Sequence, residues 1–200
     1  MEIPSLIERS HVFCEDLHDL LHGQSLPSDT RSLASAACLH LALEHHRAVV
    51  LLFRRPLVVS AGAMLRSQLE AYVKGAWLNR CAKESDVGRF EKEKEPPQFR
   101  EMVGSLEKAL PFYGSELANI KKETWRPLNN YVHSDANQAW RRIKGNELAA
   151  SGSSAEIAGG LHLASRIGTL VGLEFASLAN SDQLSQRIQH IYVQYIDNAL

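Results

Sequence analysis

The segment TWRPLNNYVHSD places an arginine, two asparagines and a histidine within a few residues of one another. If this segment is helical, Arg126 and His133 are almost two full turns apart, so their side chains share one face about 10 Å apart along the axis. Asn129 and Asn130 lie three and four residues after Arg126 and face the same side. The spacing therefore predicts a polar cluster on one side of a helix.

Such a cluster contains the groups needed for RNA cleavage without a metal. Histidine titrates near neutral pH, so His133 can act as a general base on a 2′-hydroxyl group. The guanidinium group of Arg126 offers a planar fork of donors that suits a phosphate and the charge that develops during attack on it. Asparagine can position either group, Tyr131 flanks the same face, and Arg141 could add a phosphate contact.

The same residues also allow a structural interpretation. Thr124 can serve as the N-cap of a new helix, with Pro127 in the first turn, where its missing N–H costs little. The following letters, HSDANQAW, are typical of a helix break, in which a serine or aspartate caps the next helix. At such a junction His133 can bond a backbone carbonyl, and Arg126 can pair with a carboxylate. The sequence leaves both interpretations open.

Arg126 and His133, with six residues between them, resemble the motif of the HEPN superfamily, in which four to six residues separate an arginine from a histidine. The chain also resembles bacterial helical families associated with HEPN proteins, in which an Arg-x3-Glu helix precedes a Tyr-x-His segment. Here Arg66 and Glu70 in MLRSQLEAYVKGAWL precede WRPLNNYVHSD, and the likeness covers roughly residues 59–143.

This resemblance implies a helical bundle that pairs as a homodimer and joins two motifs into one composite ribonuclease site. Arg126 would hold the phosphate and His133 would transfer the proton, with RNA as the substrate and no metal cofactor. The superfamily occurs in toxin–antitoxin and antiviral systems, so an antitoxin or defence protein is the implied partner. Active members usually carry a polar residue after the arginine, where this chain has Pro127. Other members are inactive, so the alternative is a non-catalytic dimerisation or partner-binding module.

Arg66 and Glu70 are four residues apart in the most apolar predicted helix, and we expect them to form an intrahelical ion pair. Buried charges need partners, so the pair is also expected to reach the helix that carries Arg126 and His133. Two roles remain open for it: a structural ion pair, or a pair that orients the catalytic residues.

Histidine and cysteine residues also follow one stripe of the predicted N-terminal helix and recur in the next one. These residues are His11, Cys14, His18, His22, Cys38, His40, His45 and His46. Both residue types are preferred zinc ligands, but a cysteine-containing stripe is equally typical of a buried helix face, and no HExxH motif occurs. We therefore expect no metal cofactor.

Composition restricts the class of protein. The chain has 200 residues, 44% of them hydrophobic, which is enough for one sizeable core. A net charge of −1 lacks the basic excess of a general nucleic-acid coat protein, but it leaves room for a local basic cleft. Three widely spaced cysteines favour a reduced protein. The N-terminus has no signal-peptide pattern, and the apolar stretch is interrupted by two arginines and a proline. We therefore expect a cytoplasmic protein without a membrane span.

Helical periodicity dominates the chain, so we predict a single all-α, HEPN-like bundle of about six to eight helices over residues 1–200. Helices are expected near residues 4–22, 28–53, 56–81, 85–92, 98–110, 115–121, from 124 onward, 154–180 and 182–198. The segment 144–154 is predicted to be a flexible loop because it is rich in small and polar residues. Trp77, Trp125 and Trp140 are expected to anchor the core or a dimer interface.

Overall fold

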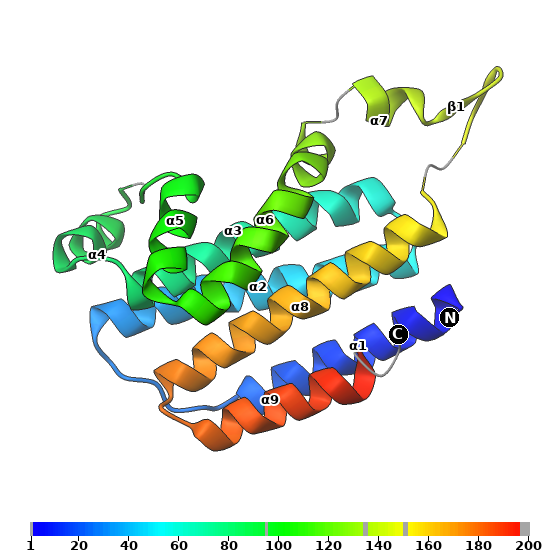
Figure 1. Cartoon of the computed structure of the whole chain (residues 1–200). Helices are drawn as coiled ribbons and strands as arrows, with labels where there is room; N and C mark the ends of the chain where they lie inside the picture. Colours follow the sequence, from blue (N-terminus) through cyan, green and yellow to red (C-terminus); the bar gives the residue numbers. More distant parts are fainter. Residues whose placement is uncertain (1, 95, 134–135, 150–151, 197–200) are drawn as a thin grey trace.

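The structure is a computed structural model of the whole chain, and it describes residues 2–94, 96–133, 136–149 and 152–196. Across these residues the chain forms nine helices and one short hairpin (Figure 1). The elements are α1 (Ile3–Leu21), α2 (Thr30–Arg54), α3 (Val58–Arg80), α4 (Glu84–Glu91), α5 (Phe99–Ala109), α6 (Pro111–Val132), α7 (Ala136–Trp140), β1 (Ile143–Lys144), β2 (Glu147–Leu148), α8 (Ser154–Leu178) and α9 (Asp182–Tyr195). The predicted all-α bundle is confirmed.

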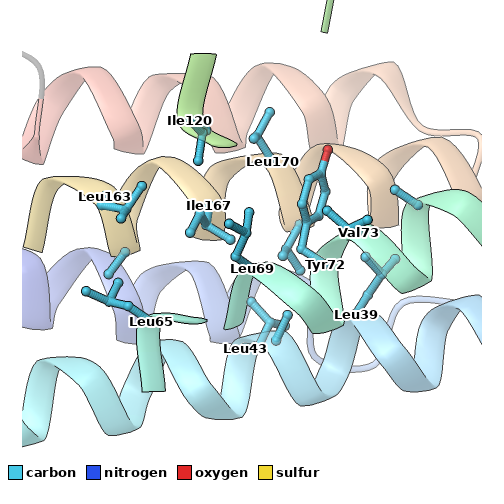
Figure 2. Packing of buried hydrophobic residues seen from close by; sticks show 14 of the residues in the cluster. Leu39, Leu43, Leu65, Leu69, Tyr72, Val73, Ile120, Leu163, Ile167 and Leu170 are labelled. Atoms are coloured by element: carbon cyan, nitrogen blue, oxygen red, sulfur yellow. The ribbon is translucent and has the colours of Figure 1, made fainter. Parts of the chain in front are cut away.

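Three long helices form the centre of the bundle. α2 and α3 pack along each other, and α8 contacts α1, α2 and α3 (Figure 1). Figure 2 shows Leu69 of α3 beside Ile167 of α8 in the core, and Leu39 of α2 lies further along the same core; each of the three is 0% exposed. Burying a side chain of this size stabilises the fold by about 1.5–3 kcal/mol before the entropy cost.

Local sequence signals determine where several helices begin. Asp29 is the N-cap of α2, and its side chain accepts the backbone N–H of Ser32 at 3.0 Å. Ser153 and Glu156 form a reciprocal capping box at the start of α8. Each of these side chains satisfies an N–H that has no partner within its helix.

The predicted helix start at Thr124 is wrong, because α6 runs from Pro111 to Val132 without interruption. The Thr124 hydroxyl donates to the carbonyl of Ile120 at 2.6 Å, one turn earlier, so Thr124 lies inside the helix. Pro127 is also internal and cannot donate to the carbonyl of Glu123, a loss that costs about 3 kcal/mol in a helix interior.

Packing offsets this cost and keeps α6 continuous. Leu117, Ile120 and Leu128 are spaced to share one face of the helix, and they are 2%, 0% and 3% exposed. A break at Thr124 would turn Leu128 away from the others and expose it. Burial of these side chains therefore outweighs the helix-start signal of Thr124 and Pro127.

The segment predicted to be a flexible loop contains a small hairpin in its described part. β1 pairs with β2 in antiparallel register, with Ile143 opposite Leu148 and Lys144 opposite Glu147. Gly145 has φ +62° at the first position of the two-residue turn, which is typical of a type II′ hairpin turn. Together α7, β1 and β2 form an arm, residues 136–148, that projects from the bundle (Figure 1). Residues 150–151 of the predicted loop lie outside the described part.

α2 is long and apolar enough, by length and composition, to cross a membrane. Half of its most apolar 18-residue window is buried inside the bundle, against α3 and α8. The same properties belong to the central helix of a globular protein, and this packing accounts for the apolar composition of α2.

Candidate functional site

Arg126 and His133 lie on the outward face of α6, and both are exposed. His133 caps the C-terminus of the helix, where its backbone N–H donates to the carbonyl of Asn129 at 3.2 Å. Within the part of the chain that the structure describes, neither side chain makes a hydrogen bond or an ion pair. Both groups are therefore available to a ligand that arrives from solvent.

Arg66 of α3 reaches α6, as predicted. Its guanidinium carbon lies 4.2 Å from the ring centroid of Trp125, a cation–π contact. Its Nη1 donates to Oδ1 of Asn129, and its Nε donates to Oε1 of Glu70 at 2.9 Å. The predicted intrahelical pair of Arg66 and Glu70 is confirmed, and its additional partners tie α3 to α6.

The ring of Trp125 stacks in turn on Phe99 of α5, with centroids 4.2 Å apart and planes 13° apart. We call Arg66, Glu70, Phe99, Trp125 and Asn129 the Arg66 cluster. The cluster joins α3, α5 and α6. It also occupies the side-chain Oδ1 of Asn129, which could otherwise position Arg126 or His133.

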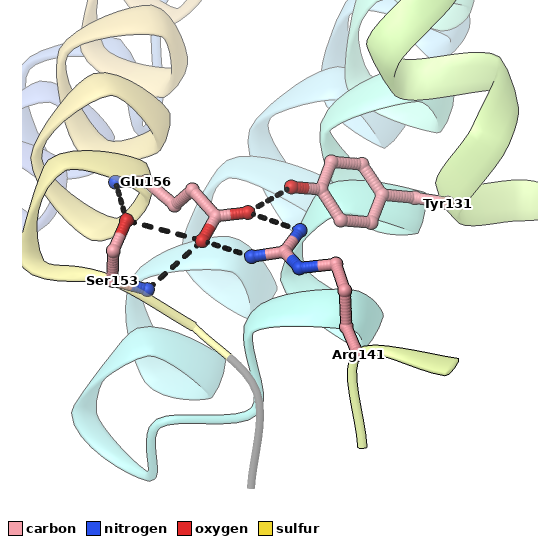
Figure 3. Close-up of polar contacts among 4 residues, drawn as sticks. All are labelled: Tyr131, Arg141, Ser153 and Glu156. Carbon is pink, nitrogen blue, oxygen red and sulfur yellow. Dashed lines mark hydrogen bonds and ion pairs between the residues drawn. The ribbon is translucent and has the colours of Figure 1, made fainter. Parts of the chain in front are cut away.

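A second cluster forms around Glu156 of α8 (Figure 3). Its Oε1 accepts from the Tyr131 hydroxyl at 3.0 Å and from Nη1 of Arg141 at 2.8 Å. Its Oε2 accepts from Nη2 of Arg141 at 2.6 Å and from the backbone N–H of Ser153 at 2.9 Å. We call these four residues the Glu156 cluster, and it joins the end of α6, the arm and the start of α8.

The contacts within the Glu156 cluster shift the pKa values of Glu156 and Tyr131. The bidentate bond from Arg141 and the bonds from Ser153 and Tyr131 lower the pKa of Glu156 to about 2. Burial and the bond to Glu156 raise the pKa of Tyr131, which keeps its hydroxyl a proton donor. Tyr131 and Arg141, predicted as supporting groups, are thus committed to Glu156 in this structure.

The sequence pattern does not predict Glu156 as a member of any site. Its partner Arg141 is 15 residues away in the chain, and Tyr131 is 25 residues away. The available local signal is Ser153-x-x-Glu156, which indicates a capping box but says nothing about an arginine from another element.

The predicted polar face is only partly assembled. Arg126 and His133 share the outward side of α6, and half-buried Asn130 makes no side-chain hydrogen bond to any described residue. Asn129 and Tyr131 instead turn toward α3 and α8.

A cavity of about 380 Å³ lies beneath α6, toward α3 and α8. Pro127, Leu128 and Tyr131 line it, whereas Arg126 and His133 do not. α6 therefore presents two distinct surfaces, one toward solvent and one toward this cavity.

Positive charge is concentrated along the second half of α6 and in the arm. Apart from Arg141, whose charge is offset by Glu156, residues 121–148 contain Lys121, Lys122, Arg126, Arg142 and Lys144 against Glu123, Asp135 and Glu147. This local excess contrasts with the net charge of −1 for the whole chain.

Trp140 in the same region is 69% exposed, so it does not anchor the core. Trp77, in contrast, is 4% exposed and does anchor it.

The histidine and cysteine stripe is divided between the core and the surface. Cys14, Cys38 and His46 are buried, and burial raises the pKa of Cys14 to about 12 and lowers that of His46 to about 4. Among the described residues, no group of three or more histidine, cysteine, aspartate or glutamate side chains could hold a metal ion.

Comparison with known protein families matches residues 39–199 to DUF6988, a family of unknown function. The match is much longer than half of the chain, and it includes the outward face of α6, both clusters and the arm. No curated protein and no solved structure matches the chain.

Proposed function

We propose that this chain, which belongs to the DUF6988 family, is a metal-independent endoribonuclease of HEPN type that acts in the cytoplasm. Arg126 and His133 are its catalytic residues. The observation that supports this proposal is the exposure of both side chains on one face of α6, without partners among the described residues. The positive charge of residues 121–148 favours an RNA backbone at the same place.

In the proposed reaction, the imidazole of His133 accepts the proton of a 2′-hydroxyl group, and the 2′-oxygen attacks the adjacent phosphorus. The bond from phosphorus to the 5′-oxygen breaks, and that oxygen takes up a proton from water. Arg126 stabilises the additional negative charge on the phosphate oxygens. The products are a 2′,3′-cyclic phosphate and a 5′-hydroxyl end.

The two catalytic residues are about 10 Å apart along the axis of α6, so the long side chain of Arg126 must extend toward His133 to reach the same phosphate. Asn130 lies between them on the same face and can bond a phosphate oxygen. We further propose that the protein acts as a homodimer in toxin–antitoxin or phage defence, with an antitoxin or defence protein as its partner, as the resemblance implies.

Cleavage of varied RNA substrates in EDTA tests the proposal. We expect His133→Ala and Arg126→Ala each to lower the cleavage rate by roughly 100-fold or more, because each removes a group that acts on the reacting atoms. His40→Ala, a change at an exposed histidine of α2, serves as the matched control and should cleave at the wild-type rate. The proposal fails if wild-type protein leaves all substrates intact, or if His133→Ala cleaves equally fast.

The second candidate function is a non-catalytic helical module that binds a partner. It is favoured by the engagement of Asn129, Tyr131 and Arg141 in structural contacts and by the position of Pro127 after Arg126. Here the structural role belongs to the Arg66 and Glu156 clusters. This alternative expects no RNA cleavage by any variant, and the same assay separates it from the nuclease.

A further inference from the structure

Trp140, the last residue of α7, presents its indole ring to solvent. The residue is 69% exposed, and within the described residues its side chain makes no hydrogen bond and no ring contact. Trp77, in contrast, is buried in the core, and Trp125 contacts both Arg66 and Phe99. Tryptophan is highly buried on average, because its ring offers a large apolar surface that stacks well on other flat groups. The ring of Trp140 is therefore available to a ligand.

The backbone at Trp140 is held by the Glu156 cluster. The next residue, Arg141, donates to both carboxylate oxygens of Glu156, at 2.8 and 2.6 Å. The indole ring is thus presented from a fixed point of the molecule, and such pre-organisation lowers the entropy cost of binding.

The surroundings of Trp140 are basic. Arg142 and Lys144 follow it in the arm, both are exposed, and neither makes an ion pair with any residue that the structure describes. Glu147 is the single carboxylate in the sequence of the arm, and it lies opposite Lys144 in the hairpin. Charged residues are depleted at the core of protein–protein interfaces, whereas surfaces for single-stranded nucleic acid combine aromatic rings with cationic side chains. The composition around Trp140 therefore favours a nucleic acid.

Trp140 also lies near the outward face of α6. It is seven residues after His133 in the chain, so the two Cα atoms are at most about 25 Å apart. Figure 1 shows α7 beside the C-terminal end of α6, and Tyr131 and Arg141 share Glu156 as their partner there. A single strand bound at Arg126 and His133 can therefore extend to the ring of Trp140.

We propose that Trp140 stacks on an unpaired base of RNA, with Arg142 and Lys144 at neighbouring phosphates, so that the substrate is single-stranded. Stacking removes the exposed face of the indole ring from water. In a duplex the bases are already stacked on one another, so their faces are closed to the ring. This inference rests on the proposed function for the class of ligand. It adds that the RNA is single-stranded and names a residue that positions it.

Binding of a fluorescein-labelled 2′-O-methyl oligoadenylate, followed by fluorescence anisotropy in EDTA, tests the proposal. This probe has no free 2′-hydroxyl group, so the proposed reaction cannot cleave it, and binding is measured separately from cleavage. Its duplex with 2′-O-methyl oligouridylate has the higher charge density, so binding by charge alone would favour the duplex. We expect the single strand to bind at least tenfold more tightly. Absence of binding to the single strand, or equal or tighter binding of the duplex, overturns the proposal.

Substitutions in the arm test the role of the ring. Trp140→Ala should weaken binding of the single strand about tenfold or more, whereas Trp140→Phe should retain most of the affinity because it keeps an aromatic face. Leu148→Ala, at an apolar position of the arm that is 86% exposed, is the matched control and should bind like the wild type. Arg142→Ala should reduce the slope of log affinity against log salt concentration by roughly 0.7. Wild-type affinity in Trp140→Ala, or an equal loss in Leu148→Ala, contradicts the assignment.

Light scattering of the wild type and of Trp140→Ala tests the competing role of the ring at a protein interface. We expect the same molecular mass for both, and circular dichroism melting shows that each variant is folded. A wild-type dimer that becomes a monomer in Trp140→Ala would assign the ring to contact with a second copy and overturn the RNA proposal. Binding as expected without cleavage of ordinary RNA would refute the nuclease and still support the stacking site, so the two proposals fail separately.

Discussion

At the scale of single residues, the outward face of α6 differs from the buried polar groups of the core. Arg126 and His133 are held in position by the helix alone, and their functional groups face solvent. His46, in contrast, is 1% exposed and packs against Phe13, with ring centroids 5.8 Å apart. A histidine in this setting affects stability rather than catalysis, because no substrate can reach it.

Burial of His46 makes the fold sensitive to acid. Its pKa is about 4 in the folded chain, below the ordinary 6.5, so the unfolded chain binds the proton more readily. The contribution of neutral His46 is therefore fully present above pH 6.5 and is lost as pH falls toward 4. At pH 5 the loss should be about 2 kcal/mol of unfolding free energy.

Urea unfolding of the wild type and of His46→Leu at pH 7.5 and pH 5.0 measures this loss. We expect His46→Leu to show a smaller decrease between the two pH values by about 2 kcal/mol. His40→Leu, at an exposed position of the same helix, should retain the wild-type decrease. An equal decrease in His46→Leu and the wild type would show that other groups cause the acid sensitivity.

At the scale of elements, the arm depends on the Glu156 cluster for its position. Its hairpin has only two residues in each strand, too few for independent stability. Arg141 connects the arm to the start of α8 through two bonds of 2.8 and 2.6 Å to Glu156. The same carboxylate also accepts a hydrogen bond from Tyr131 at the end of α6. One carboxylate therefore contacts both the arm and α6.

Glu156→Gln should release the arm. The change removes the charge that Arg141 contacts, and we expect a loss of about 1–2 kcal/mol of stability and faster hydrogen exchange across residues 136–149. The contribution of Glu156 is present above its ordinary pKa of 4.5 and is lost as pH falls toward about 2. Exchange measured by mass spectrometry checks this expectation, with Glu147→Gln in β2 as the control. Unchanged exchange in Glu156→Gln would mean that other contacts hold the arm.

At the scale of the whole molecule, close contacts between helices hold α6 on the bundle. A Cβ atom added at Gly62 of α3 would lie 2.5 Å from Cγ and Cδ2 of Tyr131. The aromatic ring therefore fits against α3 because this position has no side chain. The same contact sets how closely α6 approaches α3.

Gly62→Ala should destabilise the protein by roughly 1–3 kcal/mol, because the ring must move away from α3. Gly104→Ala in α5 is the matched control, since its added Cβ meets no atom within 4 Å. There the helix should gain about 0.5–1 kcal/mol from the higher helix propensity of alanine. Denaturant unfolding measures both changes. Equal effects of the two substitutions would show that the Gly62 contact does not position α6.

The sequence by itself determined the features that depend on near neighbours in the chain. Apolar periodicity predicted the long helices, and the spacing of Arg66 and Glu70 predicted their ion pair. Arg126 and His133 share an exposed face because seven residues make almost two turns of any helix.

Only the tertiary structure decided the features that depend on residues distant in the chain. The continuity of α6 through Thr124 and Pro127 follows from burial against α3 and α5, which outweighs the local preference for a break. The pairing of Arg141 with Glu156 and the cavity beneath α6 arise where separate elements meet. Their energies come from packing and charge contacts between elements, which local sequence spacing does not encode.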